Sequence, residues 1–340
     1  MIDNETMIDN EQVFRHSEIT RRKVTELFSR EQIRQLTARS NLLGAWAVVS
    51  TWAVIAVALA TVAWAVTQPV WLALPLLLLA LAVIAGRQLC LAILMHDAAH
   101  GTLFRSRWLN EVLTDWLCAR PIWNDLHKYR RHHLRHHRHT GSDDDSDITL
   151  IAGLPTTRAS LLRKFARDLS GLTGVKFLFG RLLQDAGLLQ WTVASDVVWL
   201  PRQAWYRHLS LLLANSWPML LSNGLLFALL AALGQGGLYA VWVLAYITPF
   251  PLFLRIRSLA EHACTERCND MFRNTRSTRA GWLARAFVAP LRVHYHIEHH
   301  VMASVPWFRL PVMHSLLRSQ QAVPPPPGYL DVLRQVSSAG

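Results

Sequence analysis

The fold is decided by NLLGAWAVVSTWAVIAVALATVAWAVTQPVWLALPLLLLALAVIAG, residues 41–86, which contains no Asp, Glu, Lys or Arg. A second stretch, residues 209–254, shares this property. Each is roughly twice the ~20 residues that cross a bilayer as a helix. Turn-forming residues interrupt each stretch near its middle, at 67–69 and at 234–237. The sequence therefore predicts an all-α integral membrane protein with two helical hairpins, whose four spans lie near residues 43–66, 71–95, 211–233 and 238–258.

The charge of the chain follows the same division. It is 51% hydrophobic, yet its formal net charge is +12, which argues against an ordinary soluble domain. Every Lys and Arg lies outside the two uncharged stretches, so the positive-inside rule places both termini and the polar segments in the cytoplasm. A basic nucleic-acid-binding protein is the alternative. Topology already explains the charge and no nucleic-acid motif is present, so we expect no nucleic-acid partner.

The polar segments predict a helical cap around one membrane domain. Residues 96–116 and 158–207 mix basic and apolar side chains, which is typical of helices at a membrane surface. We expect a domain organisation of an N-terminal cytoplasmic segment (1–40), a membrane domain (41–320) and a Pro-rich tail (321–340).

The two ends of the chain have their own patterns. Residues 1–12 repeat MIDNE, which we interpret as a duplicated start. Residues 12–40 are charged and helix-prone and predict one amphipathic helix on the cytoplasmic membrane surface. The run Pro324–Pro327 predicts a polyproline linker followed by a short amphipathic end.

Histidines form three clusters, HDAAH, HLRHH and HIEHH, which begin at His96, His133 and His296. Residues three and four apart share a helix face, so each cluster is predicted to turn its imidazoles toward one point. With 16 His in 340 residues, H-x-x-H-H is expected by chance about 0.04 times per chain, yet it occurs twice. The clusters predict a metal site on the cytoplasmic side, built from His96, His100, His133, His136, His137, His296, His299 and His300.

Ligand counting extends this prediction. Eight imidazoles exceed the four ligands of zinc or the about six of an octahedral ion, so two metals are expected, and iron, copper and zinc all suit such ligands. His262 is a candidate ninth ligand, because it follows the fourth uncharged span at the depth at which His96 follows the second. Ligating histidines usually donate their other N–H to a carboxylate or carbonyl. The candidate partners are Asp97, Asp145, Asp147, Glu298 and, beside His262, Glu261.

Four stretches carry a resemblance to a known family: HDAAHGTLFRSRWLN, YRRHHLRHHRHTGSDDDSD, RIRSLAEH and HYHIEHHVMASVPWFRLP. They resemble the membrane fatty acid desaturase and hydroxylase superfamily. The resemblance implies four membrane helices and a cytoplasmic di-iron site that uses O2 and two electrons to oxidise an alkyl chain. By this resemblance the metal ligands are His96, His100, His133, His136, His137, His262, His296, His299 and His300.

Two positions depart from the family pattern. His294 stands where Asn is common, so we expect a water-mediated metal contact to be altered or replaced by a direct one. Ser146 stands where Pro is commoner and is expected to be a tolerated turn variant. The resemblance leaves His132 and His139 as residues that support the ligands or lie at the surface. We expect ordinary hydrogen-bonded surface roles for His16, His127, His208 and His314.

The expected function is that of an O2-dependent di-iron lipid desaturase acting on an acyl-lipid, acyl-CoA or acyl-carrier substrate. An unactivated methylene has no acidic proton, so side-chain acid–base catalysis does not suffice and a cofactor is required. The same motifs fit a di-iron hydroxylase or ketolase of an acyl chain, sphingolipid or carotenoid. A metal-binding membrane protein or transporter is a third alternative, although transport sites lie within the spans, and both uncharged stretches lack His, Asp and Glu.

The sequence also predicts an external source of electrons. It contains no flavin or nucleotide fingerprint, no haem-binding domain and no four-cysteine iron–sulfur pattern. We therefore expect a ferredoxin, rubredoxin-like or cytochrome b5-like donor to dock on the basic cytoplasmic face. The lipid substrate is expected to enter from the bilayer between the spans.

Overall fold

The structure is a computed structural model that describes residues 23–339. In this part of the chain every regular secondary-structure element is a helix, and β pairing is limited to isolated bridges. Four of its helical segments are long and apolar enough to cross a membrane. The MIDNE repeat, His16 and the beginning of the expected amphipathic helix lie outside the described residues.

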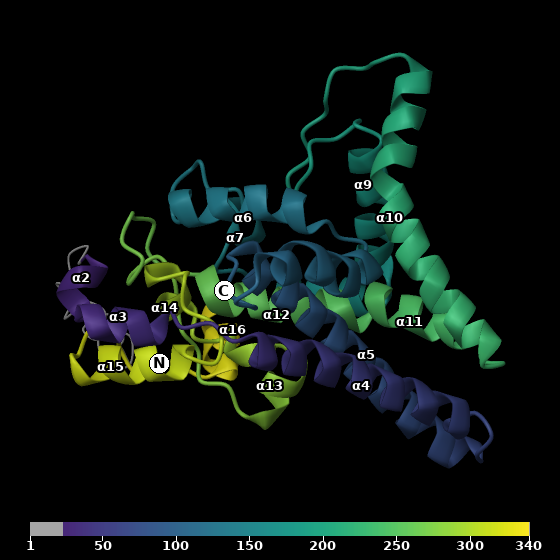
Figure 1. The fold of residues 1–340 in the computed structure, drawn as a ribbon, viewed down its shortest axis with the longest axis horizontal. Helices are drawn as coiled ribbons and strands as arrows, with labels where there is room; N and C mark the ends of the chain where they lie inside the picture. Colours follow the sequence, from purple (N-terminus) through teal and green to yellow (C-terminus); the bar gives the residue numbers. More distant parts are fainter. Residues whose placement is uncertain (1–22, 340) are drawn as a thin grey trace.

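The first three spans agree with the expected ranges to within a few residues at most ends. They are α4 (Asn41–Ala65), α5 (Val70–Ala99) and α10 (Trp205–Ala232). α10 begins six residues earlier than expected, at the polar edge of the uncharged stretch. α4 and α5 pack side by side (Figure 1), with Ile55 and Ile84 fully buried in the shared core.

The fourth span differs from the expectation in two ways. It consists of α11 (Leu238–Ile247) and α12 (Pro249–His262), which are separated at Thr248. Proline at the first position of α12 has no N–H to donate to the preceding turn, so the helix is interrupted there. α12 also continues four residues beyond the expected end at 258, which makes His262 its last residue.

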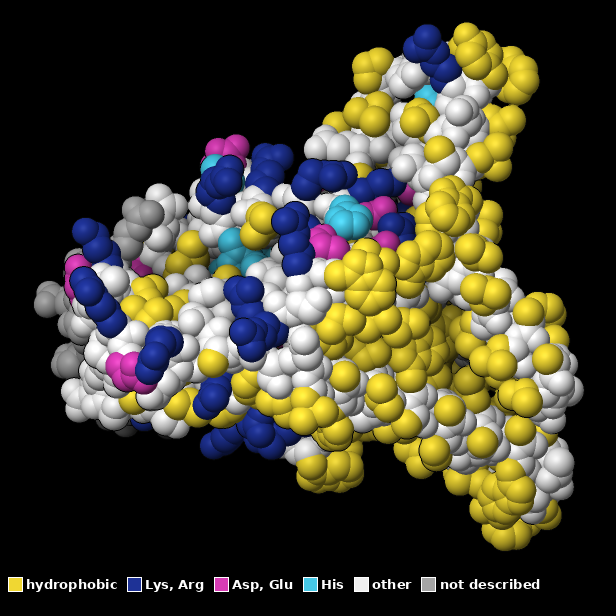
Figure 2. Space-filling model, viewed as in Figure 1, with side chains coloured by type: hydrophobic (Ala, Val, Ile, Leu, Met, Phe, Trp, Pro, Cys, Tyr) yellow, Lys and Arg dark blue, Asp and Glu magenta, His cyan; other side chains and the backbone are white. Residues whose placement is uncertain are grey.

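The outer surface of the spans is apolar. Trp46, Trp64 and Trp71 are more than half exposed on α4 and α5, and Figure 2 shows hydrophobic side chains covering the far ends of α4, α5, α10 and α11, with Lys and Arg gathered over the opposite end near α6. A contiguous apolar surface of this kind is unfavourable in water and favourable in lipid. Together with the four apolar helices, this surface identifies an integral membrane protein.

The second span ends in a way that corrects the expectation of one interfacial helix over residues 96–116. α5 stops after Ala99, because Gly101 adopts a left-handed conformation (φ +68°). Its N–H bonds to the carbonyl of Ala98 and that of Thr102 bonds to the carbonyl of Asp97, which is the Schellman arrangement that ends helices. His96 and His100 therefore belong to the end of the membrane helix itself.

The polar segments fold over this end of the spans as short helices. η1 (Leu109–Leu113), η2 (Asp115–Ala119) and η3 (Arg120–Ile122) lead into α6 (Leu126–His139). The elements that follow α6 and precede α10 are α7 (Ile148–Ile151), α8 (Arg158–Leu169) and α9 (Leu172–Asp185). α8 and α9 match the helices expected in 158–207, whereas residues 186–204 are irregular. After α12 come α13 (Trp282–Phe287), η4 (Pro290–Arg292) and α14 (His296–Val301).

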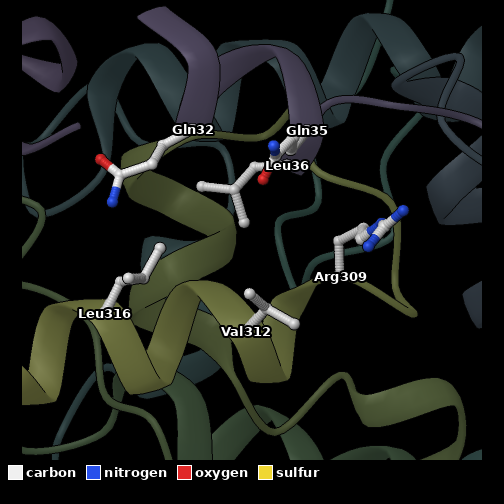
Figure 3. A pocket seen from close by; sticks show the side chains of 6 residues that line it. All are labelled: Gln32, Gln35, Leu36, Arg309, Val312 and Leu316. Atoms are coloured by element: carbon white, nitrogen blue, oxygen red, sulfur yellow. The ribbon is translucent and has the colours of Figure 1, made fainter. Parts of the chain in front are cut away.

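The N-terminal segment is not the single amphipathic helix expected for its described part. α2 (Val24–Leu27) and α3 (Arg30–Leu36) are separate, because Ser29 caps the second with its side chain. Leu27 and Leu36 are buried against α15 (Leu310–Ser319) rather than facing lipid. Figure 3 shows the shallow groove between α3 and α15, with Leu36 and Leu316 on its two sides.

The C-terminal tail is packed against the membrane domain. The expected amphipathic end is α16 (Tyr329–Val336), which lies against α12. Val332 and Val336 are buried there with Leu259 of α12. This contact supports the helix end that carries His262.

A partly buried ion pair joins the cap to α12 and gives a stability prediction. Asp168 is fully buried, and Arg255 donates to both of its oxygens at 2.5 and 2.9 Å. Replacing Asp168 with Ala removes two charge-assisted hydrogen bonds from a partly exposed guanidinium and should destabilise the fold by about 2–3 kcal/mol, measured as a lower unfolding temperature in detergent. Glu31→Ala, which removes an exposed ion pair with Arg34, is the control and should have no measurable effect. Equal stability of the two variants contradicts this assignment.

Candidate metal centre

All nine predicted histidines lie in two compact groups at the end of α5 and α12 where the polar helices fold over the spans. In each group the candidate ligand atoms lie within 4.8 Å of one another. The five-histidine group is His96, His100, His133, His137 and His299. The four-histidine group is His136, His262, His296 and His300.

The two H-x-x-H-H clusters do not each converge on one point, so that expectation was wrong. In α6, His133 and His137 join the five-histidine group while His136 joins the other. In α14, His296 and His300 join the four-histidine group while His299 crosses to the first. Residues four apart lie about 40° apart around a helix, whereas a residue three along lies about 60° to the other side. Each cluster therefore serves both groups.

The ring nitrogens within a group face one another closely. Nε2 of His137 lies 3.1 Å from Nε2 of His133 and 3.0 Å from Nε2 of His299. In the other group, Nε2 of His262 lies 3.2 Å from Nε2 of His136 and 2.7 Å from Nε2 of His296. Two imidazoles bound to one ion at about 2.0–2.1 Å have their nitrogens about 3 Å apart. The spacing fits ligands of a shared metal.

Buried atoms without partners support this fit. Nε2 of His96, His100 and His300 is inaccessible to solvent and has no hydrogen-bond partner in the protein. Such orphaned groups are rare in folded proteins unless a bound ion or water serves them. Neutral imidazole nitrogen is a good ligand for iron, copper and zinc, so the residues present fit two metal ions.

Burial keeps most of these imidazoles neutral. Burial, with the charge of Arg130, lowers the pKa of His100 to about 4. Burial and neighbouring histidines likewise hold the pKa of His133, His137, His299 and His300 well below the usual value. At neutral pH each of these rings has a lone pair free for a metal.

Two carboxylates orient the rings of candidate ligands. Nδ1 of His96 donates to Asp97 at 3.0 Å, and Nδ1 of His136 donates to Asp145 at 2.6 Å. Burial alone lowers the pKa of His136, but this hydrogen bond and the charges of Asp147 and Asp145 outweigh it and raise the pKa. A carboxylate on Nδ1 leaves Nε2 directed at the metal and makes it a better donor.

Two other predicted partners, Asp147 and Glu298, have their closest contacts with side chains outside the two groups. Asp147 bonds to His132 at 2.7 Å and remains 3.9 Å from Nδ1 of His136; the contact with His132 lowers its pKa to about 2 despite burial. Glu298 does not contact a ligand candidate, because Nδ1 of His314 (2.6 Å) and the hydroxyl of Ser277 (2.5 Å) take its two oxygens.

Glu261 faces a different ring from the one expected. Its carboxylate lies 3.6 Å from Nδ1 of His296 and 2.8 Å from Arg257, so its expected pairing with His262 was wrong. The carbonyl of Asn274 lies 3.4 Å from Nδ1 of His262 instead. Asn274 was missed because it lies in a loop without helical periodicity, and no spacing signal connects it to His262.

The other histidines in residues 23–339 lie outside both groups. His294 is buried beside Tyr295 with Nδ1 unpartnered and lies outside both groups, so of the two expected alternatives the direct metal contact is not supported. His132 supports Asp147, and His314 is a partly buried partner of Glu298 rather than a surface residue. His208 bonds to the backbone of Ala186. His127 is exposed, and His139 lies at the last turn of α6.

The helices and the two histidine groups together define a membrane protein with two groups of histidines that could each hold a metal ion. The chain belongs to the fatty acid desaturase family. The family model matches residues 69–326, which include both histidine groups and every span after α4. It is therefore an oxidoreductase of the membrane desaturase and hydroxylase superfamily. No single relative defines its substrate.

Two curated relatives show the range of this superfamily. Dihydrorhizobitoxine desaturase of Bradyrhizobium elkanii is 27% identical over 300 residues, which cover 83% of this chain and 78% of that protein. Beta-carotene 4-ketolase of Protosiphon botryoides is 25% identical over 227 residues, which cover 66% of this chain and 48% of the ketolase. Because the two names describe different oxidations, the comparisons establish the family of this chain but not the reaction that it catalyses.

The contact between Asp145 and His136 gives a prediction about metal affinity. Asp145→Asn keeps the shape of the side chain but removes the negative charge that orients His136. We expect the four-histidine group to bind metal about 10–100-fold more weakly, measured by competition with a chelator. Asp144→Asn, at the exposed neighbouring position, should leave affinity unchanged. Equal affinity of both variants contradicts the orienting role.

His294 gives a prediction of the opposite kind. His294→Asn restores the residue common in the family at a position outside both groups. We expect unchanged metal content and unchanged oxidation activity, measured by metal analysis and product analysis of the purified variant. A loss of metal from His294→Asn contradicts the placement of His294 outside the ligand set.

Proposed function

We propose that the protein is an O2-dependent di-iron lipid desaturase that introduces a double bond into an alkyl or acyl chain. The observation that carries the proposal is the convergence of nine histidines into two groups at the end of the membrane helices. Membership of the desaturase family supports an enzyme over the non-enzymatic metal-binding alternative. The proposed ligands are the members of the two groups.

The reaction converts –CH2–CH2– to –CH=CH–, with O2, two electrons and two protons consumed and two waters formed. Two irons would supply the O2 activation that removes hydrogens from an unactivated methylene, a task no side chain performs alone. The five-histidine group would hold one iron and the four-histidine group the other. The alkyl chain would reach them from the bilayer along the apolar spans.

The chain's own residues hold this arrangement in place. Asp97 and Asp145 fix the ring orientation of His96 and His136. His133, His136 and His299 are almost fully buried, so bulk water is excluded from the ligands and competing hydrolysis or proton leakage is limited.

Product analysis tests the reaction type. Mass spectrometry of lipids from cells with and without the gene should show products lighter by two hydrogens. A hydroxylase or ketolase remains the second candidate, because the relative from Protosiphon is named a ketolase. If the products gain an oxygen and none differs from its substrate only by the loss of two hydrogens, desaturation is overturned and this second candidate is favoured. Lipid profiles that differ in neither way overturn both.

The arrangement in the membrane is part of the proposal. We place α4 and α5 as one hairpin and α10 with α11 and α12 as the other, with both termini and the histidine cap in the cytoplasm. The concentration of Lys and Arg near α6 supports this orientation (Figure 2). Reporter fusions at the 66–69 and 233–237 turns should be extracytoplasmic, and fusions at the C-terminus cytoplasmic. The reverse pattern contradicts the topology.

An external one-electron donor completes the proposal. The candidates are a ferredoxin, a rubredoxin-like protein and a cytochrome b5-like protein. Three exposed arginines, Arg131, Arg135 and Arg138, lie on the outer side of α6, whose inner side carries His133 and His136. Their charge favours an acidic donor, so turnover with a plant-type ferredoxin and its reductase should fall as salt increases.

A further inference from the structure

One side chain holds the end of the helix that carries His96 and His100. Nε of Arg130 donates to the carbonyl of Ala99 at 2.8 Å and Nη2 donates to that of Ala98 at 3.1 Å. The third nitrogen donates to Glu111 of η1 at 2.8 Å. Carbonyls in the last turn of a helix have no partner within it, and a cation is favoured there. Arg130 therefore joins α5, α6 and η1.

The position of Arg130 in α6 directs this contact at one histidine group. Arg130, His133 and His137 are spaced i, i+3 and i+7 and share a face of the helix. His133 and His137 are the two ligand candidates that α6 gives to the five-histidine group. The contacts of Arg130 therefore fix the distance between α5 and the face of α6 that carries His133 and His137.

A second arginine, Arg276, makes similar contacts at the end of α12. Nη2 of Arg276 donates to the carbonyl of Ala263 at 2.8 Å and to Gln335 of α16 at 3.1 Å. Its backbone N–H donates to the carbonyl of Glu261 at 2.8 Å. Arg276 is only 6% exposed. The two arginines thus hold the ends of the two helices that present His100 and His262.

The segment around Arg276 connects α12 to α14. The hydroxyl of Ser277 accepts the N–H of Ile297 at 3.0 Å, and the N–H of Thr278 donates to the carbonyl of His294 at 2.9 Å. Asn274 of the same segment faces His262. α12 and α14 supply three of the four members of the four-histidine group, so this segment fixes their relative position.

We propose that Arg130 and Arg276 are separate positioning residues, one for each metal: Arg130 for the five-histidine group and Arg276 for the four-histidine group. The proposal rests on the two-metal centre of the proposed function. Its physical basis is that α5 contributes only to the first group and α12 only to the second. Loosening one helix end displaces ligands of one group and leaves the other assembled.

The test is metal stoichiometry and affinity of the purified full-length protein. Arg130→Gln and Arg276→Gln should each retain about one iron per chain of the two in the parent, with affinity at the affected position lower by about 10–100-fold. Double variants show which metal is lost. Arg130→Gln should add no further loss to His100→Ala but should remove the second metal from His262→Ala, and Arg276→Gln should behave in the reverse way.

Matched controls separate positioning from a general effect of removing charge. Arg131→Gln and Arg273→Gln alter exposed neighbours and should keep both metals at unchanged affinity. Arg130→Lys and Arg276→Lys keep the charge without the planar fork and should show the same site preference more weakly, which preserves the test if a Gln variant does not fold. Unchanged affinity in both Lys variants, or equal weakening of both groups in each, overturns the proposal.

This result is distinguishable from a failure of the proposed function. Metal binding is measured with Fe2+ alone, so it does not depend on turnover or on the substrate. Two metals that respond separately to the arginines, without any oxidised lipid product, support the positioning proposal and contradict the desaturase reaction. A parent protein that binds fewer than two metals overturns both.

Discussion

Replacing His262 with Ala is expected to remove one of two metals and to reduce lipid oxidation by more than about 100-fold, beyond the 10–100-fold loss typical of residues that only support a ligand. Nε2 of His262 faces Nε2 of both His136 and His296, so it occupies the centre of the four-histidine group. Without it, three imidazoles remain for that metal.

The measurement is iron per chain together with product formation, in protein shown to be folded in detergent. His139→Ala is the matched control, because His139 neighbours the ligand candidates in α6 but belongs to neither group. It should retain two irons and full activity. Unchanged iron content in His262→Ala removes His262 from the ligand set, and loss of both irons contradicts the division into two groups.

Removing both metals is expected to lower the unfolding temperature substantially. The two groups join four helices, α5, α6, α12 and α14, and a ligand that binds only the folded state stabilises it by about 4 kcal/mol at 1,000 times its Kd. Two metals at this saturation contribute about 8 kcal/mol together, which at about 2–4 °C per kcal/mol for chains of 150–250 residues implies a decrease on the order of 15–30 °C. The physical reason is that the nine imidazoles link the four helices to one another only when the ions are bound.

The measurement compares metal-loaded and chelator-treated protein in the same detergent, with metal removal verified by elemental analysis. The control is the double variant His100→Ala/His262→Ala, in which chelator should cause little further decrease. An unchanged unfolding temperature after verified removal of both metals contradicts a role of the centre in linking the helices.

The spans could be predicted from the sequence because their signal is local. Uncharged stretches of sufficient length become membrane helices whatever surrounds them, and α4 and α5 follow the expected ranges closely. The break at Thr248 was missed, although Pro249 and Pro251 were visible signals. The prediction of one amphipathic helix for the N-terminal segment was wrong. It assigned the apolar residues of this segment to the membrane surface, whereas Leu36 packs on α15.

The candidate ligands were predictable for a similar reason. Spacings of three and four residues place histidines on one side of a helix before any tertiary contact forms. The partners of those ligands were less predictable. Asp145 and His136 are nine residues apart and meet through a turn, whereas His262 and Asn274 meet through a loop, and Glu298 turns to His314 across a helix–helix contact. Sequence proximity alone does not distinguish these cases.

The sequence by itself determined four apolar spans, a basic cap and three histidine-bearing helix faces, because hydrophobicity and helical periodicity act over a few turns of one helix. Only the tertiary structure decided how those faces meet. The rotation of α6 and α14 against α5 and α12 sends His136 and His299 to the opposite group from their neighbours. Arg130 and Arg276 contact helix ends far away in the sequence. Such rotations depend on packing between helices, which no single helix encodes.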